Sequence, residues 1–173
     1  MFAKLLLSMV IITSGGIIGY IMAFRYVQRL QQLKNLYISF QLLETEIQYS
    51  SNSLPGALYR VGMKSNKFIG DFFLDTQRIL DSRTGCSIEE AWAKAIESNI
   101  SSTSLDQEDQ DVLLDFGNNL GCTDREHQLK NFQYIYLQLK KRQEHAEIQR
   151  QKNENMFKNL GVLIGIAIVI VFI

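Results

Sequence analysis

The stretch LLLSMVIITSGGIIGYIMAF, residues 5–24, carries no charged side chain and decides how the rest of the chain is organised. As a helix rising about 1.5 Å per residue it reaches roughly 30 Å, the thickness of a bilayer's hydrocarbon core. A secretory signal peptide is the alternative, because Lys4 precedes the apolar run and small residues follow at 13–16. The apolar character resumes at Ile17 and continues to Phe24, which favours a transmembrane helix.

A second charge-free stretch, LGVLIGIAIVIVFI, occupies residues 160–173. As a helix it reaches only about 21 Å, so a buried core helix is the alternative by length. If the segment starts at Met156, and Lys158 extends its ammonium group to the interface, it becomes long enough to span. We therefore expect transmembrane segments at 1–24 and 159–173, around a domain at 25–158.

Basic residues lie beside the inner end of each apolar segment, and Lys4 alone lies on the outer side. They are Arg25, Arg29 and Lys34 after the first segment, and Lys140, Lys141, Arg142, Arg150, Lys152 and Lys158 before the second. Short flanks rich in Lys and Arg stay preferentially in the cytoplasm. The pattern predicts a multi-pass protein of the cell membrane, with a cytoplasmic domain and both chain ends across the membrane.

The domain at 25–158 is nearly neutral, because it holds all 18 acidic residues and every basic residue except Lys4. This balance argues against nucleic acid as a partner, since phosphates call for a clustered basic surface. Cys86 and Cys122 form no C-x-x-C pair, which favours free thiols in a reducing compartment.

Helical periodicity runs through the whole domain, and Pro55 and scattered glycines interrupt it. Capping boxes predict three helix starts, at Ser87 with Glu90, Ser104 with Gln107 and Thr123 with Glu126, and Ser53 before Pro55 predicts a fourth. Gly85 and Gly121 are placed as left-handed helix stops. The expected helices cover 25–49, 54–64, 68–82, 88–99, 105–119 and 124–158. The sequence predicts an all-α fold, an antiparallel six-helix bundle between an N-terminal and a C-terminal transmembrane helix.

The first helix of the domain carries apolar side chains on two opposite faces. One stripe consists of Leu33, Leu36, Tyr37, Phe40, Leu43 and Ile47, and the other of Ile38, Leu42 and Tyr49. Such a helix is either central in the bundle or offers one face to a partner. The last helix has one stripe, formed by Leu129, Phe132, Tyr136, Leu139 and Ala146.

The search for chemistry yields no catalytic residue, no cofactor site and no metal site. The close glycines Gly117 and Gly121 lack the Lys and Ser or Thr of a phosphate-binding loop. His127 and His145 lie five helical turns apart, about 27 Å, so they cannot share a metal ion within one chain. We therefore expect that the chain is not an enzyme.

Four acidic residues, Asp106, Glu108, Asp109 and Asp111, resemble a calcium loop only superficially, because its glycine and terminal glutamate are misplaced. Favourable charge at a helix N-terminus explains them more simply, and a docking surface for a partner is the alternative. Glu44 falls inside the apolar arc of the first helix. It either reaches solvent from the edge of that arc or forms a structural ion pair, with Arg125 as one candidate partner.

Small residues four apart occur in both apolar segments, as Gly15 with Gly19 and Gly161 with Gly165. This spacing lets helices approach closely in lipid. It predicts either that the two segments of one chain pair, or that two protomers meet in a homo-oligomer.

The chain resembles the stage III sporulation protein AB family of endospore-forming bacteria. The resemblance is carried by its two terminal anchors and by the order of several blocks along the chain. These are residues 29–47 with LETEI at 43–47, SLP at 53–55, FGNNLG at 116–121 leading to Asp124, and KNENMFKNLG at 152–161. None of the blocks is catalytic.

The resemblance implies a component of the channel complex that joins mother cell and forespore. The family is similar to half of the inner-membrane platform protein of type II secretion and type IV pilus machines, whose cytoplasmic domain is a six-helix bundle. It implies a secretion-type ATPase and other membrane components of the complex as partners, a domain on the mother-cell side, and anchors in the outer forespore membrane. The function expected is a non-enzymatic platform, and the alternative is a membrane-anchored sensor domain that binds a ligand or metal.

Overall fold

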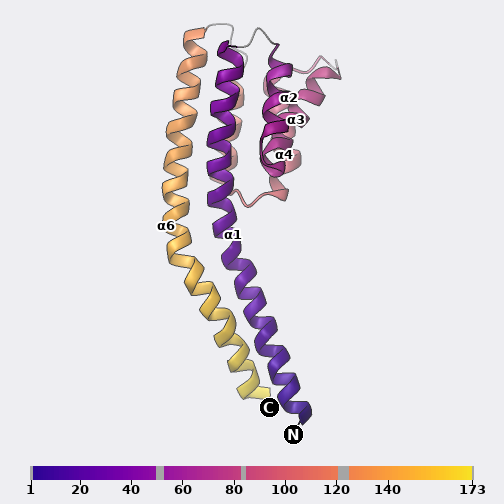
Figure 1. Ribbon diagram of the computed structural model, residues 1–173, viewed down its shortest axis with the longest axis vertical. Coiled ribbons are helices and arrows are strands. Elements are labelled where there is room, and N and C mark those ends of the chain that lie inside the picture. Colours follow the sequence, from indigo (N-terminus) through magenta and orange to yellow (C-terminus); the bar gives the residue numbers. More distant parts are fainter. Residues whose placement is uncertain (1, 50–52, 83–84, 121–124, 173) are drawn as a thin grey trace. The chain divides into compact units, whose positions relative to one another are not determined.

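The structure, a computed structural model, describes residues 2–49, 53–82, 85–120 and 125–172, leaving aside the side chains of 2–8, 12, 125, 158, 162, 165, 171 and 172. Within these ranges the chain forms six α-helices, one short 3-10 helix and no strand. They are α1 (Phe2–Tyr49), α2 (Leu54–Lys64), α3 (Lys67–Asp81), α4 (Ile88–Asn99), η1 (Ile100–Ser102), α5 (Gln107–Asn118) and α6 (Arg125–Phe172) (Figure 1). The predicted all-α class with six helices is confirmed.

The chain divides into two compact units, and α1 and α6 contribute to both. The terminal unit comprises Met1–Leu30 and His145–Ile173. The bundle unit comprises Gln31–Glu144 and contains α2 to α5. Each unit has its own packing, described in turn below.

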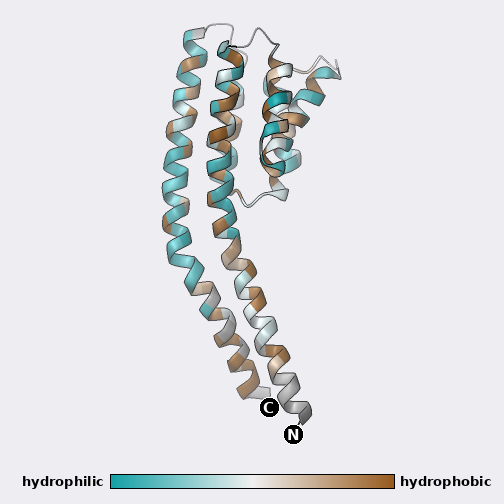
Figure 2. Cartoon of the chain, in the orientation of Figure 1, coloured by the Kyte–Doolittle hydropathy of each residue, from teal (hydrophilic) through white to brown (hydrophobic). Residues whose placement is uncertain are grey.

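In the terminal unit, α1 and α6 run antiparallel, with both chain ends at the same end of the unit (Figure 1). The rings of Tyr26 and Phe157 stack with centroids 5.8 Å apart, and Arg29 Nη1 donates a hydrogen bond of 2.7 Å to Gln149 Oε1. Hydropathy rises along α6 toward its C-terminal end, where Figure 2 shows mostly brown residues. By length and composition, two helices, one within 9–49 and one within 126–170, are apolar enough to cross a membrane.

The core of the bundle unit forms along one face of α1. Leu33, Leu36, Phe40 and Leu43 are all fully buried, as their common stripe predicts. Aromatic side chains from other helices surround Phe40, with ring centroids at 5.8 Å for Phe73, 6.1 Å for Trp92 and 4.6 Å for Phe116. Such offset and edge-on pairs add stability beyond the burial of their area.

Gly117 lets α5 approach the buried Trp92 closely. A Cβ atom at Gly117 would stand 2.3 Å from Trp92 Cδ1, which no side chain could occupy without displacing the indole. The indole Nε1 also donates a hydrogen bond of 2.7 Å to Leu113 O. The glycine therefore serves core packing.

The start of α5 differs from the sequence prediction. The N-cap is Asp106, whose carboxylate accepts from Asp109 N at 3.0 Å while Asp109 Oδ2 accepts from Asp106 N at 3.1 Å. The predicted box of Ser104 with Gln107 is wrong, because the backbone N–H of Ser104 instead donates to Gln32 Oε1 at 2.7 Å.

The starts of α4 and α2 lie where the predicted serine caps place them. Ser87 Oγ accepts from Glu90 N at 3.1 Å, and Ser53 stands at the N-cap of α2 with a proline in the first turn. Gly85 has a positive φ of 72°, although it lies in the loop after α3 instead of directly at the helix end. Thr123, Cys122 and Gly121 lie outside the described residues, and Cys86 is a free thiol.

Candidate interaction surfaces

The second apolar stripe of α1 faces outward. Ile38 is 61% exposed and Tyr49 is 80% exposed, while Leu42 is half-buried. Beside this stripe lies a shallow depression of about 100 Å³. It is lined by Asn35, Ile38, Ser39 and Leu42 of α1 and by Lys64, Ser65 and Asn66 at the end of α2. The stripe thus forms an exposed apolar surface with a basic and hydroxyl-bearing edge.

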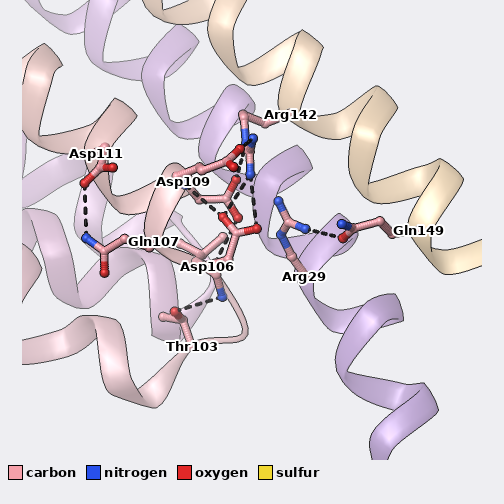
Figure 3. A network of polar contacts seen from close by, with 10 residues as sticks. Arg29, Thr103, Asp106, Gln107, Asp109, Asp111, Arg142 and Gln149 are labelled. Carbon is pink, nitrogen blue, oxygen red and sulfur yellow. Dashed lines mark hydrogen bonds and ion pairs between the residues drawn. The ribbon is translucent and has the colours of Figure 1, made fainter. Parts of the chain in front are cut away.

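Asp106 and Asp109, at the acidic start of α5, turn toward Arg142 of α6 (Figure 3). Arg142 Nε donates to Asp109 Oδ1 at 2.7 Å, and Arg142 Nη2 donates to Asp106 Oδ1 at 2.9 Å. A third contact joins Arg142 Nη1 to Glu108. One guanidinium therefore holds three carboxylates from a single helical turn.

Burial distinguishes the members of this cluster. The Asp109 side chain is fully buried, and that of Arg142 is only 10% exposed. Burial by itself lowers the pKa of Arg142, but the hydrogen bond and negative charge of Asp109, with the charge of Asp106, outweigh it and raise that pKa above its ordinary value. The guanidinium of Arg142 is therefore held in its charged form beside the buried carboxylate of Asp109.

This arrangement limits which residues of the acidic segment could meet a partner. Asp109 cannot be reached by another protein, because it is buried under α6 and paired with Arg142. Asp106 caps its own helix and shares Arg142. Glu108, whose side chain is 71% exposed, and Asp111, which accepts from Gln107 at 3.1 Å, remain on the surface.

In the sequence, Arg142 was counted only among the basic residues beside the second apolar segment, and its role as the buried partner of Asp109 was missed. A signal was present, since Arg142 falls three residues after Leu139 and four before Ala146, on the apolar stripe of the last helix. Asp109 likewise precedes Leu113 by four residues and Phe116 by seven. Two opposite charges that each interrupt an apolar stripe indicate a buried pair.

Glu44 is half-buried and binds neutral partners. Its Oε2 accepts from the Tyr136 hydroxyl at 2.6 Å, and its Oε1 accepts from Gln48 Nε2 at 2.9 Å. Burial, followed by the hydrogen bond to Glu44, raises the pKa of Tyr136 well above its ordinary value near 10. The side chain of Arg125, the ion-pair partner that we considered, lies outside the described residues, so that pairing stays a prediction.

The structure brings three of the four predicted packing glycines together in the terminal unit. A Cβ at Gly19 would stand 2.5 Å from Phe157 O, and one at Gly161 would stand 2.5 Å from Gly15 O. The two helices of one chain therefore meet backbone to backbone at this point. The surroundings of Gly165 lie outside the described residues.

A groove of about 360 Å³ lies between α5 and α6. Asp115, Asn119, His127, Lys130, Asn131 and Tyr134 line it. In the part of the chain that the structure describes, no group of three or more His, Cys, Asp or Glu side chains could hold a metal ion.

Replacing Arg142 by methionine leaves the carboxylate of Asp109 buried without a cation, so we expect the free energy of unfolding to fall by about 3–5 kcal/mol. The measurement is urea unfolding of the full chain in detergent, followed by the fluorescence of Trp92, the single tryptophan. The control Lys141→Met removes an exposed neighbouring charge and should change stability by less than about 0.5 kcal/mol. Equal effects of the two variants would contradict the role of the pair, and Arg142→Met/Asp109→Leu should recover stability.

The raised pKa of Tyr136 predicts that the free energy of unfolding depends on pH in the alkaline range. The folded state keeps the phenol protonated, whereas the unfolded chain releases the proton near pH 10, so stability is constant below that pH and falls above it. This contribution is at most about 1.4 kcal/mol per pH unit. The stability gap between wild type and Tyr136→Phe should therefore shrink between pH 9 and 11. A constant gap, or the same shrinkage with Tyr134→Phe at an exposed tyrosine, would argue against this role.

Comparison with known proteins shows which family has this sequence and architecture. A sequence model of the stage III sporulation protein AB family matches residues 4–173. Stage III sporulation protein AB of Bacillus subtilis (strain 168) is 29% identical over 167 residues, which cover 96% of this chain and 97% of the relative. A solved structure of stage III sporulation protein AB matches with a TM-score of 0.68 and 26% identity, covering 72% of this chain and 98% of the solved one. The chain belongs to the stage III sporulation protein AB family.

Proposed function

We propose that this sporulation protein is a non-enzymatic membrane platform, whose bundle unit docks a cytoplasmic secretion-type ATPase within the complex between mother cell and forespore. Membership of the stage III sporulation protein AB family supports a role in sporulation. The resemblance to the platform proteins of secretion machines supports a secretion-type ATPase as the partner. The six-helix architecture is consistent with both.

The observation that carries the docking proposal is the outward stripe of α1. A helix whose inner face is fully buried at Leu33 and Phe40 has no need of Ile38 for the core, yet Ile38 is large, apolar and 61% exposed. An apolar residue beside a depression and a lysine offers a partner a small pocket with a charged edge. An exposed apolar surface with a polar edge is the kind of surface that proteins use for contact with a partner.

The two long apolar helices support membrane association of the protein. We infer transmembrane segments at 1–24 and 159–173, and a domain at 25–158 in the mother-cell cytoplasm. The basic residues beside the inner ends of the segments support this orientation. The anchors then lie in the outer forespore membrane, together with lipid and other membrane components of the complex.

The test uses the full chain in lipid nanodiscs and the purified sporulation ATPase, with binding and ATP turnover measured together. Ile38→Asp places a charge in the apolar contact, and we expect the affinity to fall at least tenfold, about 1.4 kcal/mol. The matched control is Ile148→Asp, since Ile148 is the same residue at 64% exposure on the other long helix. We expect this control to bind like wild type.

Three results would count against the proposal. The wild-type chain fails to bind the ATPase saturably, Ile38→Asp binds as tightly as wild type, or Ile148→Asp loses binding to the same degree. Thermal unfolding of each variant, followed at Trp92, checks that a loss of binding does not come from a loss of fold.

A further inference from the structure

One line of side chains on α6 combines apolar and basic groups on the solvent side of the bundle unit. Lys130, Tyr134, Leu137 and Lys141 follow one another at intervals of four, three and four residues, so they lie on one face of the helix. Leu137 is 67% exposed and Tyr134 is 47% exposed. The core-facing side of the same helix is formed by Phe132, Ile135 and Leu139. We call this line the basic row.

A line of opposite sign runs along the outer side of α5. Glu108, Asp111 and Asp115 follow one another at intervals of three and four residues, and all three are exposed. We call this line the acidic row. Among the described residues, neither Asp115 nor Lys141 forms an ion pair, and Lys130 pairs only with Glu126 of its own helix, at 2.7 Å. The two rows therefore do not neutralise each other within the chain.

Contacts fix the two rows side by side and antiparallel. At one end, Glu108 contacts Arg142, the neighbour of Lys141. At the other end, Asp115, Lys130 and Tyr134 line the same groove between the helices. The acidic residue at each level thus lies next to a basic residue at the same level.

Such a face is complementary to itself. A two-fold axis parallel to the helices and between the rows places the acidic row of one copy on the basic row of the other, at matching levels. Asp115 then meets the second copy's Lys130. Lys141 of the second copy meets Glu108 and, one helical turn along, Asp111, while Tyr134 and Leu137 are covered near the axis.

We propose that the α5–α6 face is the contact between two copies of this chain. Charge complementarity selects this occupant, because a partner of one sign would be attracted by one row and repelled by the other. Tyr134 and Leu137 provide the apolar area that the contact buries, and the charged residues provide its register and specificity. This contact lies on other helices than the α1 stripe, so it stands independently of the proposed ATPase docking.

The experiment measures the association of the full chain in density-matched detergent by sedimentation equilibrium. One variant is Lys130→Glu/Lys141→Glu and the other is Asp111→Lys/Asp115→Lys, each of which sets like charges opposite each other. We expect wild type to dimerise, each variant alone to associate at least tenfold more weakly, and an equimolar mixture of the two to regain the wild-type affinity. The mixture also controls for folding, since misfolded variants would not rescue each other.

A matched control reverses two exposed acids of α4, in Glu89→Lys/Glu97→Lys, with the same change in net charge and no expected loss of dimer. Three outcomes would overturn the proposal. Wild type stays monomeric at all accessible concentrations, the mixture associates no better than its components, or the α4 control weakens the dimer as much as the α5 variant does. A monomeric wild type that still binds the ATPase would reject this contact alone and leave the proposed function standing.

Discussion

The buried pair of Asp109 and Arg142 sets the register between α5 and α6, and the packing of the bundle unit around these two helices follows that register. A carboxylate with no exposure needs a cation at hydrogen-bond distance, and in this chain the guanidinium comes from a helix 33 residues further along the chain. The pair fixes how α5 and α6 slide along each other. The same register sets Phe116 against Phe132, with centroids 5.4 Å apart, and brings Asn131 to Phe116 O at 3.2 Å. It also sets the levels of the charged rows on the outer surface.

Most of the fold could be predicted from the sequence because local signals and burial agree there. Helices α2 and α4 begin and end where the proline, the serine cap and the periodicity place them. The stripe of α1 predicted the core because large apolar residues on one face of a helix are removed from water when that face packs against other helices. The start of α5 was misplaced because Ser104 and Asp106 both match a capping pattern. Tertiary contacts decided between them, since Gln32 binds the backbone of Ser104 and Arg142 binds Asp106.

The candidate surfaces were harder to predict, because exposure depends on which helix covers which face. The sequence indicated two apolar faces on α1, and only the packing of the other helices shows that Ile38 lies outside. The acidic residues looked alike in sequence, yet Asp109 is buried and Glu108 is exposed one position away. The two described partners of Glu44, a phenol and an amide, carry no charge, so pairing charges along the sequence could not find them.

The proposed platform requires a membrane anchor at each end of the chain and a cytoplasmic bundle between them. The direct measurement is a reporter enzyme that is active only in the cytoplasm, fused after Ile173 in one strain and inserted in the loop between α3 and α4 in another. This topology predicts activity from the loop and none from the C-terminal fusion, with equal amounts of both proteins in the membrane fraction. Activity from the C-terminal fusion would contradict the topology, because it would show that residues 159–173 do not cross the bilayer.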